Sequence, residues 1–175
     1  MPKIIEGLRE RILETAGRML LETGYQALTV RAVATECGVA VGTVYNYFPS
    51  KELLVASLML EDWKRCLAHM RERSEAAPSA EQGMRALYEE LCAFRARYSS
   101  AWAQYTARGG DLHQVRSRHG MLVEQLTEVM RACLDRFLSP PDAICAEAAA
   151  NLLLTYAQHE SAFERIAPAV MKLLQ

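Results

Sequence analysis

Between residues 30 and 49 the chain carries side chains that could contact the edges of nucleic-acid bases. The amide of Asn46 can form two hydrogen bonds with adenine, and Thr43 offers a hydroxyl together with a methyl group. Both contacts require an element that holds the side chains outward and fits the major groove, which accepts an α-helix. The elements around these two residues therefore decide whether they can meet a duplex.

Three small or apolar residues predict what those elements are. Ala34 allows two helices to approach closely, Gly38 tolerates the positive φ of a tight turn, and Val44 packs the second helix onto the first. This spacing predicts a helix-turn-helix, although taken alone it also arises by chance in helical proteins. The second helix would present four residues outward: Gly42, Thr43, Asn46 and Tyr47.

A longer run makes the pattern specific. The segment from Gly38 to Leu54, GVAVGTVYNYFPSKELL, closely resembles the signature of the TetR family of transcriptional regulators. The segment LTVRAVA at residues 28–34 resembles the helix before it, and residues 12–16 with Gly24-Tyr25 are similar to the first helix of the family and its end. The resemblance covers about residues 8–58 and implies a regulator that binds DNA through its first fifty residues.

The resemblance also implies roles for individual residues. Thr29 and Arg31 would start the supporting helix and meet phosphate or a base edge, and Lys51 would bind a phosphate near a helix N-terminus. Tyr45 and Tyr47 would flank the DNA backbone. The whole implied set is Thr29, Arg31, Val41, Gly42, Thr43, Tyr45, Asn46, Tyr47 and Lys51. The alternative is that the aromatic residues belong to the core and the cations to an ordinary solvated surface.

Ala40 departs from the pattern of the family. Relatives usually place serine there as the cap of the third helix, whereas alanine leaves one backbone amide without a partner. We expect this to cost about 0.5 to 2 kcal/mol of local stability. Position 46 varies among relatives, so the resemblance gives Asn46 no base preference.

The rest of the chain predicts helices, and the fold class is all-α. Apolar residues recur every three or four positions, and no long segment alternates with period two. We expect about nine helices, with a three-helix helix-turn-helix domain over residues 1–51 and a helical ligand-binding and dimerisation domain over residues 52–175.

Several helix boundaries can be predicted from single residues. Gly24 should end the first helix, Thr29 should cap the second, and Ser50 should cap a long helix that ends near residue 73. A helix over about residues 80–98 should be followed by a separate segment around residues 101–108. Pro168 should mark either a break in the last helix or its late start.

The resemblance implies a small-molecule effector held by the middle helices. Eight residues are candidate lining residues, although most of them also suit a plain core: Trp63, Tyr88, Phe94, Trp102, Tyr105, His113, Met121 and Tyr156. Such a mixture suits an apolar or aromatic ligand better than a highly charged one.

The last two helices would form a homodimer interface around a two-fold axis. The candidate residues are Ala149, Leu152, Leu153, Phe163, Ile166 and Val170. The alternative is that these helices cover the core of their own subunit.

Composition narrows the function classes. The 175 residues are 51% hydrophobic and 23% charged, as in ordinary folded proteins, and the net charge of −1 gives no global argument for nucleic acid. Because we see neither a signal peptide nor an apolar run of membrane length, we expect a cytoplasmic protein that does not bind a membrane. The five scattered cysteines favour reduced thiols, with no metal site and no cofactor.

Two other function classes compete with a regulator. His159-Glu160 begins like a zinc-protease helix but lacks the second histidine, and no phosphate-binding loop appears, so we expect no catalytic residues. A helical adaptor without DNA binding is the other alternative. We expect a repressor that leaves a pseudo-palindromic double-stranded operator when its effector binds, with activation as the open alternative.

Overall fold

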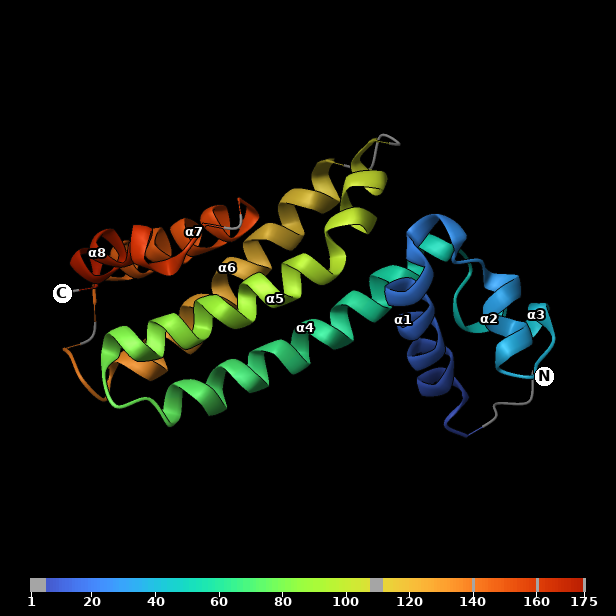
Figure 1. The fold of residues 1–175 in the computed structure, drawn as a ribbon, viewed down its shortest axis with the longest axis horizontal. Coiled ribbons are helices and arrows are strands. Elements are labelled where there is room, and N and C mark those ends of the chain that lie inside the picture. Colours follow the sequence, from blue (N-terminus) through green and yellow to red (C-terminus); the bar gives the residue numbers. More distant parts are fainter. Residues whose placement is uncertain (1–5, 108–111, 140, 160, 175) are drawn as a thin grey trace. The chain divides into compact units, whose positions relative to one another are not determined.

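The computed structural model describes residues 6–107, 112–139, 141–159 and 161–174, without the side chains of residues 102, 104–107 and 112–119. These described residues form eight α-helices and no strand (Figure 1), which confirms the all-α fold class. The helices are α1 (Leu8–Ala27), α2 (Val30–Glu36), α3 (Val41–Tyr47), α4 (Lys51–Glu75), α5 (Ala80–Ala107), α6 (Leu112–Leu134), α7 (Ala143–Gln158) and α8 (Phe163–Leu173).

The chain divides into two compact units. Unit 1 contains Met1–Trp63 and Arg97–Ala107, and unit 2 contains Lys64–Ala96 and Arg108–Gln175. Unit 1 holds α1 to α3 with one part each of α4 and α5, and unit 2 holds α6 to α8 with the other parts. The functional division between residues 51 and 52 stays a prediction.

Short-range signals set most helix ends. Gly24, which the sequence predicts to end the first helix, has φ 81° and ψ 169° and interrupts the helical geometry, but α1 as a whole extends beyond it to Ala27. The Thr29 hydroxyl accepts a hydrogen bond from the Ala32 amide at 3.1 Å, which confirms Thr29 as the cap of α2. The Ser50 hydroxyl accepts from the Leu53 amide at 3.2 Å at the start of α4.

Two predicted boundaries are wrong. The helix expected to end near Tyr98 continues as α5 to Ala107, because Tyr98 and Ala101 are both buried and continue its apolar stripe. This merger brings the count to eight. Pro168 lies inside α8 without breaking it: its ring is exposed, and the buried Phe163, Ile166 and Val170 hold the helix against its neighbours.

Unit 1 contains a buried carboxylate. Asp62 of α4 is 7% exposed, and it accepts hydrogen bonds from the Tyr98 hydroxyl and, at 3.0 Å, from the Arg97 guanidinium of α5. A buried carboxylate is tolerated when such donors satisfy it. These bonds join α4 to α5 within the unit.

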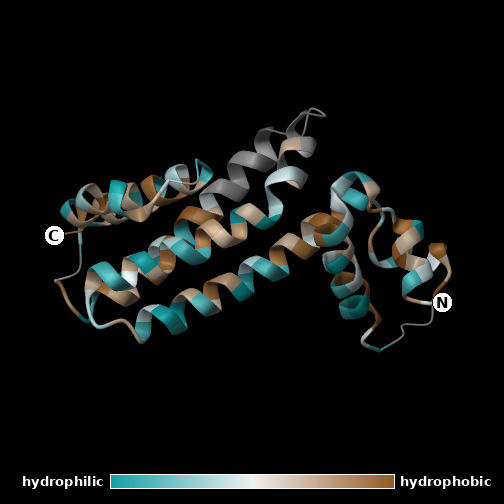
Figure 2. Ribbon diagram, viewed as in Figure 1, coloured by the Kyte–Doolittle hydropathy of each residue, from teal (hydrophilic) through white to brown (hydrophobic). Residues whose placement is uncertain are grey.

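Unit 2 has its apolar core where α5, α6 and α7 present buried side chains, among them Leu87, Leu126, Met130 and Leu153. Figure 2 shows hydrophobic and hydrophilic residues mixed along α4 and α5. Such a mixture is expected of amphipathic helices. Gly83 of α5 permits a close approach to α6, because a Cβ added there would overlap the Sγ of Cys133.

Candidate nucleic-acid interface

The segment from α2 to α3 turns within four residues. Gly38 has φ 65°, a left-handed conformation that glycine adopts without strain. The Gly38 amide donates to the Thr35 carbonyl at 3.1 Å, and the Val39 amide donates to the Ala34 carbonyl at 3.0 Å. These bonds satisfy the last carbonyls of α2 and direct the chain into α3.

The two helices are clamped by the residues that the sequence singles out. Ala34 and Val44 are both 0% exposed, and α2 packs directly on α3. Phe48 follows α3 with 2% exposure, and the Arg9 guanidinium lies 5.7 Å from its ring centroid. This confirms the predicted helix, tight turn and helix.

The α3 residues other than Val44 are at least partly accessible. Gly42, Tyr45 and Asn46 are exposed, with 47% for Tyr45, whereas Val41, Thr43 and Tyr47 are half-buried. Thr29 and Arg31 are exposed at the start of α2. Eight of the nine residues implied for DNA binding are therefore exposed or half-buried in α2, in α3 or at the cap of α2, and their contact with DNA stays a prediction.

Lys51, the ninth, is held differently. Its Nζ donates to the Tyr25 carbonyl and lies 4.1 Å from the centroid of the Tyr25 ring. Lys51 is half-buried, and Tyr25 is 3% exposed. The lysine thus joins the start of α4 to the end of α1, a structural contact that its position in the sequence does not indicate.

Other basic residues of this region also stabilise the fold. The Arg11 guanidinium donates to the Cys37 carbonyl at 3.2 Å, and Arg18 pairs with Glu36 at 2.8 Å. Both contacts join α1 to α2 and its turn. Sequence reasoning missed them because they link residues far apart along the chain.

The third helix lacks a side-chain cap. Ala40 has an extended backbone at the N-cap position of α3, and no side chain bonds to the first amides of the helix there. This confirms the prediction that Ala40 leaves α3 without the side-chain cap that serine provides in relatives. The first turn of α3 is therefore less stabilised than that of α2.

The candidate effector residues are placed in several ways. Trp63 is buried in unit 1, and Tyr88 is buried in unit 2, where its hydroxyl donates to the Ser161 carbonyl at 2.6 Å. Phe94, Met121 and Tyr156 are half-buried in unit 2. Three further candidates have side chains outside the described ones: Trp102, Tyr105 and His113.

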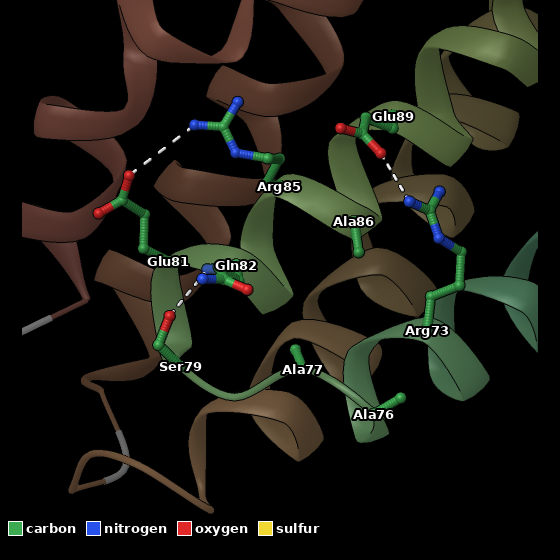
Figure 3. Close-up of a pocket in the computed structure, with 9 residues that line it drawn as sticks. All are labelled: Arg73, Ala76, Ala77, Ser79, Glu81, Gln82, Arg85, Ala86 and Glu89. Atoms are coloured by element: carbon green, nitrogen blue, oxygen red, sulfur yellow. Dashed lines mark hydrogen bonds and ion pairs between the residues drawn. The ribbon is translucent and has the colours of Figure 1, made fainter.

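A surface groove of about 620 Å³ lies elsewhere, between the end of α4 and the start of α5 (Figure 3). None of the five candidates with described side chains lines it. Its two arginines are already paired, since Arg73 contacts Glu89 at 2.6 Å and Arg85 contacts Glu81 at 3.9 Å.

The candidate dimer residues lie mostly inside their own chain. Five of the six are at most 3% exposed in this single chain: Ala149, Leu153, Phe163, Ile166 and Val170. Leu152 alone is half-buried. These five side chains therefore pack within their own chain, and a dimer interface built from them stays a prediction.

The described residues contain neither a cluster of metal ligands nor a membrane-spanning helix. Within the described ranges, no three His, Cys, Asp or Glu side chains gather as metal ligands would. None of the helices described is both long enough and apolar enough to span a bilayer.

Known proteins to which this chain is similar include transcriptional regulators. Residues 12–58 match the family described as bacterial regulatory proteins, tetR family. The HTH-type transcriptional regulator UidR of Escherichia coli (strain K12) is 28% identical over 152 residues, which cover 85% of this chain and 78% of that protein. The repressor KstR of Rhodococcus jostii is 44% identical over 57 residues, covering 33% of this chain and 27% of that protein.

Among solved structures, the chain is similar to the TetR-family transcriptional repressor FadR of Thermus thermophilus in complex with lauroyl-CoA. That match has a TM-score of 0.63 and 19% identity and covers 94% of this chain and 92% of the other. At 19% identity, this match shows a similar fold only.

Proposed function

The chain is a DNA-binding transcriptional regulator of the TetR family, and from this premise we propose that it represses transcription and leaves its operator when a small molecule binds. The observation that carries the proposal is the accessible face of α3, held outward by the buried Ala34 and Val44. A helix clamped in this way can enter the major groove.

Within that face, Thr43 and Asn46 are the side chains that we propose contact base edges. Asn46 is exposed and can bind adenine through two hydrogen bonds, and Thr43 can meet a thymine methyl or a base acceptor. Thr29, Arg31, Tyr45 and Tyr47 would contact the DNA backbone, which fixes orientation without reading sequence.

The effector would bind among the helices from residue 52 onward. The complex of FadR with lauroyl-CoA is a precedent for a small-molecule ligand in this fold. In our proposal the ligand changes the spacing of two DNA-binding heads in a homodimer, so that they no longer match successive major grooves. Such coupling typically requires about 1 to 3 kcal/mol of differential affinity.

The homodimer would use the outward face of α7. Ile144 is 77% exposed, and Ala148, Leu152 and Thr155 continue the same face at helical spacing with exposed or half-buried side chains. An exposed apolar stripe of this kind suits a two-fold helix contact. Sedimentation equilibrium should show a dimer that Leu152→Asp converts to a monomer, whereas Lys172→Asp on α8 should leave it intact.

Selection of sites from a random duplex pool tests DNA binding directly. We expect the full chain to select an imperfect palindrome, with affinity that falls steeply as salt rises. Asn46→Ala should relax the preference at one base pair per half-site, at a cost of about 1 to 3 kcal/mol. Asn151→Ala on α7 is the matched control and should leave the selected sequence unchanged. A wild-type chain that selects no sequence at any salt would exclude the proposal.

A further inference from the structure

Arg95 of α5 is half-buried, and no carboxylate among the described residues pairs with its guanidinium. Within the described part of the chain, no hydrogen bond, ion pair or ring contact engages its guanidinium. The two other described half-buried arginines of unit 2 have oxygen partners: Arg85 pairs with Glu164, and Arg131 donates to the Pro141 carbonyl at 3.4 Å. Arg95 therefore differs from its counterparts in the same unit.

Arg95 shares one side of α5 with a buried aromatic residue. Arg95 lies seven residues after the buried Tyr88 and three residues after the half-buried Cys92, so the three lie on one side of the helix. The Tyr88 hydroxyl donates to the Ser161 carbonyl. Arg95 is the positively charged residue of the three.

An arrangement of this kind is unfavourable for the free protein. A partly desolvated guanidinium costs free energy unless an anion or several acceptors compensate it. Burial lowers the pKa of Arg95 from its ordinary value, but an arginine in a protein does not lose its proton. The charge therefore persists, and a bound anion would remove the penalty.

We propose that Arg95 binds an anionic group of the effector, and that the effector is an organic acid with a carboxylate or phosphate on an apolar or aromatic body. This inference rests on the proposed function, since it names the chemistry of the effector. A guanidinium can hold either group through two parallel hydrogen bonds. The half-buried Phe94, Met121 and Tyr156 of the same unit suit the apolar body.

The groove of Figure 3 is a weaker candidate for an anion. Its Arg73 donates to both Glu89 and Glu90, at 2.6 and 2.9 Å, and its Arg85 is paired with Glu164. An added anion would have to displace these carboxylates. Arg95 has no such competitor among the described residues.

Binding of matched charged and uncharged probes tests the inference. Calorimetric titration of the full chain would compare decanoate with decanamide, benzoate with benzamide, and phenyl phosphate with phenol. We expect the wild type to bind at least one anion more tightly than its uncharged analogue. Arg95→Gln should weaken that anion about tenfold or more and leave the analogue unchanged. Arg95→Lys should recover part of the affinity.

Arg165→Gln is the matched control, because Arg165 is an exposed arginine of α8. It should bind the anion like the wild type. Equal binding of the anion by Arg95→Gln would overturn the inference, as would a wild type that binds none of the three anions. Whether carboxylates or phenyl phosphate respond to Arg95→Gln identifies the group.

A second measurement needs no ligand. Replacement of an uncompensated charge by an apolar side chain of similar size should keep or raise stability, so Arg95→Met should raise the melting temperature by about 2–4 °C. A fall of several degrees would show that Arg95 stabilises the free fold and would overturn the proposal. Titrations with operator DNA test the proposed function separately from the anion site. A chain that binds the anion through Arg95 but does not bind DNA would refute only the proposed function.

Discussion

Lys51 and Tyr25 are joined by two contacts at once: the lysine Nζ donates to the tyrosine carbonyl and lies 4.1 Å from the centre of its ring. The contact brings together residues far apart in sequence, and it fixes the start of α4 against the end of α1. A charge in this position can stabilise the fold and still lie near a DNA backbone.

Replacement of Lys51 by methionine separates these two roles. We expect the free energy of unfolding to fall by about 1–2 kcal/mol, from the lost hydrogen bond and cation–π contact. DNA binding should weaken uniformly across sequences, and the slope of log affinity against log salt should decrease by about 1. Tyr25→Leu removes the ring and keeps the carbonyl, so it should reproduce part of the stability loss. An unchanged salt slope in Lys51→Met would assign the lysine to the fold alone.

Ala40→Ser should supply the cap that α3 lacks. A serine hydroxyl at this position can accept from a free amide of the first turn, as Thr29 does for α2. We expect about 0.5–2 kcal/mol of added stability in thermal or denaturant unfolding. Thr29→Ala provides the opposite test and should destabilise the domain by a similar amount. A loss of stability in Ala40→Ser would show that the turn cannot admit the hydroxyl.

Gly38 and Gly42 should respond oppositely to alanine. An added Cβ meets nothing within 4 Å at either position, so only the backbone distinguishes them. Gly38 has φ 65°, and alanine there should cost about 1 kcal/mol. Gly42 lies within α3, where alanine should add about 0.5–1 kcal/mol. Denaturant unfolding of the two variants measures the contrast, and a stabilising Gly38→Ala would contradict the structure.

The close approach of α5 and α6 at Gly83 predicts a compensating pair. Gly83→Ala places a methyl group against the Sγ of Cys133, which is 2% exposed, and should destabilise unit 2 by about 1–3 kcal/mol. Cys133→Ala removes that sulfur, so the double variant should recover much of the loss. A double-mutant cycle measured by thermal unfolding gives the coupling. Additive losses would mean that the two positions do not touch.

The helix-turn-helix could be predicted because its determinants are local. The positive φ of Gly38, the small Ala34 and the capping hydroxyl of Thr29 each act within one turn of the chain. The contacts of Lys51 with Tyr25 and of Arg18 with Glu36 depend on how α1 packs, which spacing along the chain does not encode.

The C-terminal half was harder to predict for a different reason. An apolar helix face has the same pattern in sequence whether it covers its own core or a partner, so the pattern around Leu153 and Ile166 does not reveal that both are buried in the single chain. The helix end predicted near Tyr98 was wrong: α5 continues, because no glycine or proline lies between Tyr98 and Ala101 to end it. The lack of a carboxylate partner for Arg95 among the described residues depends on helix packing, which its position in the sequence does not encode.

Unit 1 is discontinuous along the chain, since Arg97–Ala107 belongs to it together with Met1–Trp63. During synthesis α1, α2 and α3 emerge from the ribosome first, but Asp62 must wait for Tyr98 and Arg97 before its carboxylate leaves water. A nascent chain that stops before α5 therefore carries the helix-turn-helix without the contacts that complete its unit. Truncated products should accordingly be more exposed to proteases than the finished protein.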